Sequence, residues 1–131
     1  MPIVWKEEYN TGEPEVDKQH KVLFKYLEDL ESHMKTGDIN DRYIKMLLNN
    51  LGIFTRSHFC YEEICMRRLK CPVAAENKEF HGKLLAAYDK YCERFETEGA
   101  SDDLIQQLHD FLESWLINHI LKIDTNLRAC L

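Results

Sequence analysis

Apolar side chains recur every three or four residues along most of this 131-residue chain, which is the spacing of one face of an α-helix. The alternating pattern of a half-buried β-strand is absent. Glycines and prolines divide the pattern into four runs, and the predicted helices cover about residues 15–36, 40–69, 73–96 and 101 to between 124 and 127. Four helices with short connections pack as an up-down-up-down bundle, so we predict an all-α four-helix bundle.

The ends of the predicted helices carry residues that commonly start or stop helices. Gly37 and Gly99 follow the first and third runs, where a glycine closes a helix easily because it tolerates a positive φ. Asp38 or Asn40 can cap the second helix, and Pro72 prevents that helix from continuing.

The start of the chain differs from the rest. Residues 1–14 lack a helical period, so we predict an extended N-terminal arm in which Trp5 and Tyr9 pack against the body of the protein. The bundle itself is predicted for residues 15–127. With 44% hydrophobic and 31% charged residues, the chain has the composition of one soluble globular domain, which we assign to residues 1–131.

Charge and cysteine content narrow the choice of partners and of compartment. The net charge of −6 argues against nucleic acid or an anionic membrane as a partner. No apolar run approaches the roughly 20 residues of a membrane span, and the polar start of the chain does not resemble a signal peptide. The five cysteines are odd in number and lack CxxC spacing, so we expect reduced thiols in a cytoplasmic protein rather than disulfides or a zinc site. These are Cys60, Cys65, Cys71, Cys92 and Cys130.

Each predicted helix places one histidine on its apolar face, in order His20, His58, His81 and His119. The first and third lie near the starts of their helices, and the second and fourth lie near the ends of theirs. In an up-down-up-down bundle, these four positions lie at the same end. The remaining two, His33 and His109, fall away from the apolar faces and are predicted to face solvent.

Two carboxylates accompany these histidines. Glu62 follows His58 by four residues, so both side chains leave the same face of a helix. That pair alone fits a buried hydrogen bond as well as a metal ion, because a buried carboxylate needs a partner in either case. Asp124 follows His119 by five residues, which a regular helix places about 140° apart. For both to reach one site, the last turn must loosen through a π-bulge or fraying.

Four imidazoles at one level favour metal binding over four unrelated core histidines, and a metal-free bundle fits this pattern poorly. Imidazoles with a few carboxylates suit iron, zinc or copper better than calcium or magnesium. Two carboxylates among four histidines suggest two metal ions that the carboxylates bridge. The ferritin-like class is excluded, because it requires Glu-x-x-His, and no glutamate here has a histidine three residues later.

These motifs resemble the hemerythrins, in particular the single-domain bacteriohemerythrins, over nearly the whole chain. The matching pieces are Trp5, Asp17-Lys18-Gln19-His20, His58-Phe59-x-x-Glu62-Glu63, His81, Trp115-Leu116-Ile117-Asn118-His119-x-x-x-x-Asp124 and Cys130-Leu131. The resemblance implies a non-haem di-iron centre, oxo- or hydroxo-bridged, that binds O2 at one iron. The ligands it implies are a histidine pair for each iron and two bridging carboxylates, namely His20 with His58, His81 with His119, and Glu62 with Asp124. The first pair would hold the iron that receives O2. Leu116 would line the O2 pocket, although ordinary core packing explains it equally well.

One position departs from the family pattern. Asn77 stands where a histidine ligand is expected, four residues before His81, and an amide oxygen is a poor iron ligand beside imidazole. A water, Glu76 or Glu79 could fill the gap, and we expect Asn77 to hydrogen-bond such a water. Each iron would then keep two histidines. We predict that the iron near His81 is lost more easily than in relatives with the full ligand set, and that the O2 adduct is shorter-lived.

Several functions remain open at this point. The first is O2 binding for carriage or storage. The second is an O2 or redox sensor that passes the state of the iron to an output domain or redox partner, which the altered ligand set favours. A di-iron enzyme, such as a peroxidase or an iron- or NO-handling enzyme, is disfavoured because no free general acid or base is evident beside the ligands. We therefore predict that the protein is not an enzyme.

Overall fold

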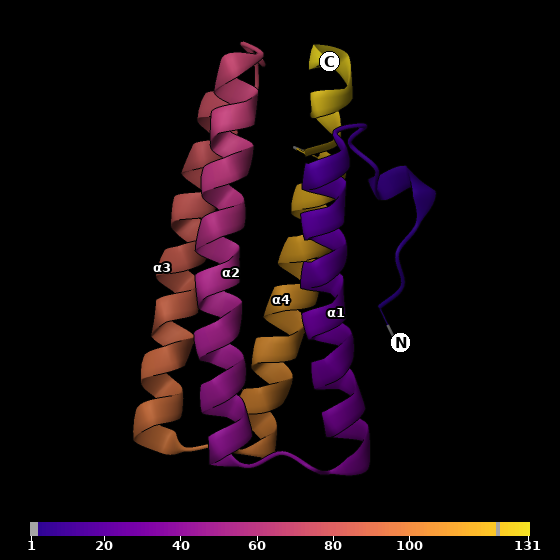
Figure 1. Ribbon diagram of the computed structural model, residues 1–131. Helices are drawn as coiled ribbons and strands as arrows, with labels where there is room; N and C mark the ends of the chain where they lie inside the picture. Colours follow the sequence, from indigo (N-terminus) through magenta and orange to yellow (C-terminus); the bar gives the residue numbers. More distant parts are fainter. Residues whose placement is uncertain (1–2, 123) are drawn as a thin grey trace.

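The computed structural model of the protein describes residues 3–122 and 124–131, which form four α-helices in an up-down-up-down bundle (Figure 1). The helices are α1 (Pro14–Thr36), α2 (Asp41–Arg68), α3 (Ala74–Glu98) and α4 (Asp102–Lys122). Two 3-10 helices flank them, η1 (Glu7–Tyr9) and η2 (Asp124–Cys130). The predicted all-α bundle is confirmed. None of the helices in the described part of the chain is both long enough and apolar enough to cross a membrane.

Polar caps and glycines set the helix ends close to the predicted positions. At the start of α2, the side chain of Asn40 accepts a hydrogen bond of 2.9 Å from the backbone N–H of Tyr43, so Asn40 rather than Asp38 is the cap. Gly37 ends α1 with a φ of 73°, and Gly99 ends α3 with a φ of 78°. Both angles lie in the left-handed region, where a side chain would be strained.

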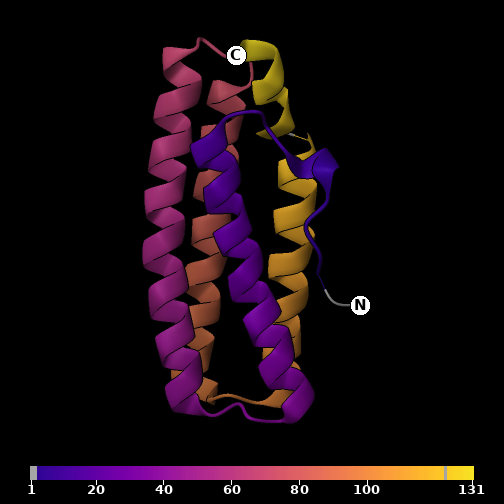
Figure 2. The same ribbon diagram turned by 45° about the vertical axis from the view of Figure 1, so that its right-hand side comes forward.

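The helix connections alternate between the two ends of the bundle. The α1–α2 and α3–α4 loops lie together at one end, and the α2–α3 turn lies at the other beside η2 (Figures 1 and 2). We call this second end the η2 end. Because α1 starts there and α2 finishes there, histidines near the start of one helix and the end of the next lie at the same level.

The N-terminal arm is held to the body as predicted. The ring of Trp5 packs edge-on against Phe24 of α1, with ring centroids 5.1 Å apart, and Tyr9 lies 5.4 Å from the same ring. Arg128 of η2 holds the arm from the other side. Its guanidinium donates hydrogen bonds to the backbone carbonyl oxygens of Asn10 (2.5 Å) and Glu8 (2.8 Å).

Two hydrophobic cores lie along the bundle axis. The larger core extends along all four helices, and the smaller core lies at the η2 end. On α1, the small-core residue Val16 lies one turn beyond His20, and on α2 the small-core residue Met66 lies one turn beyond Glu62. The polar residues between the cores are therefore bounded by apolar side chains on both sides. The buried residues of the small core are Val16, Met66, Cys71 and Leu127.

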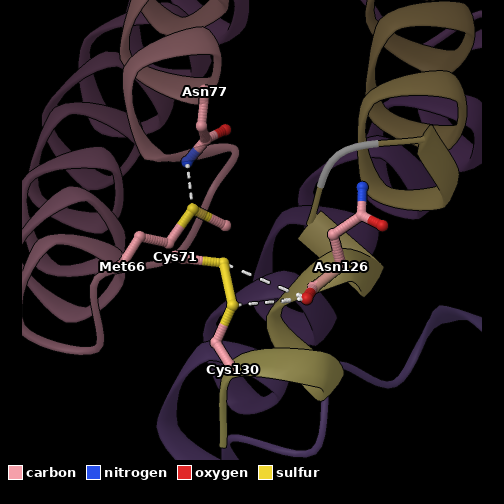
Figure 3. The surroundings of a disulfide bond; sticks show 5 residues. All are labelled: Met66, Cys71, Asn77, Asn126 and Cys130. Atoms are coloured by element: carbon pink, nitrogen blue, oxygen red, sulfur yellow. Dashed lines mark hydrogen bonds between the residues drawn. A yellow bond between two sulfur atoms is a disulfide. The ribbon is translucent and has the colours of Figure 1, made fainter.

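A disulfide joins Cys71, in the turn between α2 and α3, to Cys130 in η2, with their Cα atoms 5.5 Å apart (Figure 3). The prediction of five reduced thiols is therefore wrong. The pair is separated by 59 positions, and only the bundle topology returns both segments to the η2 end. Cys60, Cys65 and Cys92 are free thiols. Because the expectation of a cytoplasmic protein rested partly on reduced thiols, the disulfide removes that support.

His109 is buried, contrary to the prediction that it faces solvent. It lies four residues after Ile105 and seven before Leu116, both buried, so it shares the apolar face of α4 from which the prediction had excluded it. Glu31 of α1 lies against it, and its Nε2 is 2.6 Å from a Glu31 carboxylate oxygen. Glu113 lies 3.5 Å from the same nitrogen. A partner on another helix makes the burial of this imidazole tolerable, and one helix's pattern cannot reveal that partner. His33 stays partly exposed and stacks on Tyr43, with ring centroids 3.9 Å apart.

Candidate metal centre

All six predicted ligands meet inside the bundle at the η2 end, between the two hydrophobic cores. Each keeps 5% or less of its surface exposed, so water cannot solvate their charges. They come from every α-helix and from η2. We call this group the histidine–carboxylate cluster, and its members are His20, His58, Glu62, His81, His119 and Asp124.

Glu62 lies at the middle of the cluster. Its Oε2 is 3.0 Å from Nε2 of His20 and 3.2 Å from Nε2 of His58. Its Oε1 is 3.2 Å from Nε2 of His81. A single carboxylate from α2 thus faces imidazoles from α1, α2 and α3, one oxygen toward each side of the cluster.

Asp124 links the imidazoles of α1 and α4. Its Oδ2 lies 3.1 Å from Nε2 of His20, and its Oδ1 lies 3.1 Å from Nε2 of His119. Helix α4 ends at Lys122 and η2 begins at Asp124, so the backbone changes from α to 3-10 geometry between His119 and Asp124. This change provides the loosening that the five-residue spacing required. Residue 123 lies outside the described residues.

The potential ligand atoms form two groups that share Glu62. One group contains His20, His58 and Glu62, and the other contains Glu62, His81, His119 and Asp124. Within each group the ligand atoms lie within 4.8 Å of one another. This arrangement suits two cations with a carboxylate between them.

The hydrogen bonding of these atoms tests whether a metal fits. Nε2 of His81, Nε2 of His119 and Oδ1 of Asp124 are fully buried and lack a hydrogen-bond partner, although each lies close to another cluster atom. A buried polar atom without a partner typically costs about 1–3 kcal/mol. Unpartnered nitrogens and oxygens that converge on one point are the donor set that a metal ion requires. The residues therefore fit the di-iron centre that the resemblance implied.

Two residues outside the predicted ligand set orient the imidazoles. Nδ1 of His58 donates to Oε1 of Gln19 (2.7 Å), and Nδ1 of His81 donates to Oε2 of Glu63 (2.9 Å). A proton held on Nδ1 leaves the Nε2 lone pair free to face the cluster. The sequence assigned no role to Gln19 or Glu63. The available signal is their position beside His20 and Glu62 in the chain.

Aromatic rings fix the planes of two imidazoles. The ring of Phe59 stacks on His81 with centroids 3.7 Å apart and an angle of 4° between the planes. Trp115 stacks on His119 at 4.7 Å and 10°. Together with the hydrogen bonds at Nδ1, these contacts limit rotation of the imidazoles, and a preformed site requires such restraint.

The electrostatics of the cluster favour a positive charge at its centre. Burial lowers the pKa of His20, but its hydrogen bonds to Asp124 and Glu62 outweigh burial and raise the pKa to about 10. Burial raises the pKa of Glu62, but the imidazoles of His20, His58 and His81 around its carboxylate outweigh burial and hold this pKa well below its usual range. Burial lowers the pKa of His58. The carboxylate of Glu62 therefore stays ionised, and without a metal a proton on His20 compensates its charge.

Asn77 lies beside the cluster and is completely buried on α3. Its Nδ2 donates to Oε1 of Glu62 (2.8 Å) and to the sulfur of Met66 (3.3 Å), and its Oδ1 has no partner. The amide therefore contacts the carboxylate directly, and the predicted hydrogen bond to a water stays a prediction. Glu76 and Glu79 are exposed and do not replace the missing ligand.

Leu116 is buried on α4, three residues before His119. It lines a cavity of about 40 Å³, and Leu51, Leu84 and Trp115 line other parts of the same cavity. A cavity with almost entirely apolar walls holds water poorly and admits small apolar molecules. The role of Leu116 in an O2 pocket stays a prediction.

Comparison with known proteins gives a consistent result. Residues 11–131 match the family described as Hemerythrin HHE cation binding domain. The chain is 28% identical to a bacteriohemerythrin from Stenotrophomonas maltophilia over 118 residues, which cover 90% of this chain and 74% of the relative. It is 25% identical to a bacteriohemerythrin from Clostridium acetobutylicum over 124 residues, covering 93% and 95% of the two chains. Hemerythrin subunit 1 from Golfingia vulgaris is 27% identical over 123 residues, covering 94% and 88%.

Proposed function

This chain belongs to the hemerythrin family, and from that premise we propose that it is a non-haem di-iron protein that binds O2 for carriage or storage. Family membership supports di-iron oxygen binding in general terms. The ligand set and the use made of bound O2 are parts of the proposal. The observation that carries it is the pair of buried ligand groups that share Glu62 and contain unpartnered ring nitrogens.

The proposed ligands follow the two groups of atoms. His20 and His58 would hold the iron that receives O2, and His81 and His119 would hold the other iron. Glu62 would bridge the two, and the approach of Asp124 to both His20 and His119 supports a second bridge. When bound, the iron pair supplies the capacity to bind O2 reversibly.

The other residues around the centre would hold it and keep it dry. Gln19 and Glu63 keep the Nδ1 protons of His58 and His81 in place, so their Nε2 atoms face inward. The apolar cavity beside Leu116 would admit O2 and disfavour water. Asn77 would hold Glu62 through its amide instead of acting as a ligand.

Hemerythrin-family proteins are generally oxygen binders rather than enzymes, and we propose binding rather than catalysis here. Asn77 favours a second candidate, an O2 or redox sensor. A centre with one histidine fewer exposes iron to oxidation more readily, which makes it a poorer carrier and a usable switch. In that case an unidentified output partner would read the state of the iron.

The test is anaerobic loading with ferrous iron, followed by metal counting and an absorbance spectrum on addition of O2. We expect two irons per chain and an O2-dependent absorbance band that disappears under vacuum. A long-lived band would favour a carrier, and rapid conversion to the ferric state would favour a sensor. One iron or none would overturn the di-iron proposal.

Matched variants separate the centre from other histidines. His119→Ala removes a proposed ligand and should reduce the iron content and abolish the O2 band. His33→Ala removes a partly exposed histidine on α1 and should leave both unchanged. Equal iron content in the two variants would contradict the ligand assignment.

A further inference from the structure

The Cys71–Cys130 disulfide connects the two segments that carry the carboxylates of the cluster. On one side, Cys130 and Asp124 belong to the same short helix, η2. Leu127 in the middle of that helix is completely buried in the small core, next to Cys71 and Met66. The position of η2 therefore determines where the Asp124 carboxylate lies.

On the other side, a chain of contacts leads from Cys71 to Glu62. The backbone N–H of Cys71 donates to the carbonyl oxygen of Met66 over 2.9 Å. The Met66 sulfur accepts a hydrogen bond from Nδ2 of Asn77 (Figure 3). The same Nδ2 also donates to Glu62. The disulfide thus connects the residues that hold the Glu62 carboxylate, through Met66 and Asn77, to η2, which carries Asp124.

The disulfide is accessible to a reductant from one side. Cys71 is buried, whereas Cys130 is partly exposed. Both sulfur atoms lie near the backbone carbonyl oxygen of Asn126, at 4.0 Å for Cys71 and 3.6 Å for Cys130 (Figure 3). After reduction, that oxygen can accept a hydrogen bond from the thiol of either Cys71 or Cys130, so the two thiols have a polar partner close by.

We propose that the Cys71–Cys130 disulfide is a reversible redox latch on the metal centre. When it is closed, it holds η2 and Asp124 against the α2–α3 turn. When it is open, η2 stays attached through the contacts of Asp124 with His20 and His119, the burial of Leu127 and the two hydrogen bonds of Arg128, so η2 loosens without the bundle unfolding. The effect on bound iron rests on the proposed function, whereas the movement of η2 does not.

The reductant that opens this latch is a protein or small-molecule dithiol. One thiolate of the dithiol attacks Sγ of Cys130, the more exposed sulfur, and the S–S bond breaks with its electron pair going to Sγ of Cys71, which takes up a proton. The second thiolate of the reductant then attacks the mixed disulfide and releases Cys130, which also takes up a proton. The pair gains two electrons and two protons, and the dithiol leaves as its own disulfide.

The first experiment uses the metal-free full chain before and after treatment with dithiothreitol. Alkylation under denaturing conditions should count three thiols before treatment and five after it, returning to three when the reductant is replaced by its oxidised form. Amide hydrogen exchange in residues 124–130 should accelerate at least tenfold on reduction, with exchange in residues 47–55 of α2 unchanged. Five thiols before treatment, or unchanged exchange in residues 124–130, would overturn the proposal.

The second experiment measures coupling to the metal on iron-loaded protein. Without reductant, a ferrous chelator should extract iron at least fivefold faster from the Cys71→Ser/Cys130→Ser variant than from the unaltered protein. The matched Cys60→Ser/Cys92→Ser variant should release iron at the unaltered rate. Equal extraction from all three would overturn the coupling. If no form of the protein binds iron, the proposed function fails, and the thiol count and hydrogen exchange still decide whether the latch exists.

Discussion

Nδ2 of Asn77 donates a hydrogen bond to Oε1 of Glu62 over 2.8 Å, at the position where the hemerythrin pattern has a histidine ligand. The chain therefore holds its central carboxylate with a neutral amide and supplies one potential ligand fewer. The amide also donates to Met66, so the same side chain links the centre to the small core. This relationship distinguishes the site from the family pattern.

Replacing Asn77 with histidine should strengthen the site. An added imidazole gives the iron near His81 a third nitrogen ligand, so we expect Asn77→His to slow chelator extraction of iron by about tenfold or more. Its O2 adduct should also persist longer in stopped-flow absorbance. The control Asn50→His adds a histidine to the exposed face of α2 and should change neither rate. If Asn77→His releases iron as fast as the control, the missing ligand does not limit metal retention.

Glu63 should matter through its acceptor oxygen. Glu63→Leu removes the acceptor for Nδ1 of His81, and we expect a 10–100-fold loss of iron affinity in a chelator competition. Glu63→Gln keeps an acceptor oxygen and should retain most of the affinity. Glu79→Leu, on the exposed face of α3, is the control for lost surface charge. Equal losses in the leucine and glutamine variants would show that charge, not hydrogen bonding, is responsible.

The small core should contribute measurably to stability. Leu127 is completely buried there, so Leu127→Ala leaves a cavity, and we expect the free energy of unfolding to fall by about 2–5 kcal/mol. Leu121 is 38% exposed, and Leu121→Ala should change the free energy of unfolding by less than about 0.5 kcal/mol. Urea denaturation of the metal-free, oxidised protein measures both. Similar values for the two variants would mean that η2 is not packed as described.

His109 should make stability depend on pH. Burial lowers its pKa, but hydrogen bonds to Glu31 and Asp110, and the charge of Glu113, outweigh burial and raise the pKa above 6.5. The pKa of His109 is higher in the folded than in the unfolded protein. The stabilisation that the protonated imidazole contributes is therefore complete below about pH 6.5 and is lost as the pH rises through the folded pKa.

The variant His109→Gln tests this dependence. We expect it to lower the free energy of unfolding by about 0.5–1 kcal/mol more at pH 5.5 than at pH 9, since the ion pair is partly screened by solvent. Urea denaturation at the two pH values, on metal-free protein, gives the difference. A loss for His109→Gln that is constant with pH would assign its role to packing alone.

The sequence predicted the features that depend on one helix and on the order of helices. Spacing placed His20, His58, His81 and His119 on apolar faces, and the topology then placed them at one level. The same reasoning failed where a contact forms between distant segments. The pairing of Cys71 with Cys130 needs the bundle to return both segments to one end, and no single helix shows it.

His109 and Asn77 show the same difference between features of one helix and contacts between helices. His109 was assigned to solvent from the stripe of α4, but the carboxylate that makes its burial tolerable comes from α1. Asn77 was recognised as a departure because its place in the motif is visible in the sequence. Its contacts with Glu62 and Met66 were not predicted, because the direction of the amide depends on side chains of the facing helix.

The position of the histidine–carboxylate cluster between two hydrophobic cores has a consequence for how the helices align. Layers of leucine can replace one another with little loss, so an apolar bundle tolerates a slip of one turn between helices. Such a slip would move Glu62 away from the imidazoles of α1 and α3 and bury it against apolar side chains, at a high desolvation cost. The cluster thus fixes the axial alignment of the helices, so that the bundle has one register even before any metal arrives.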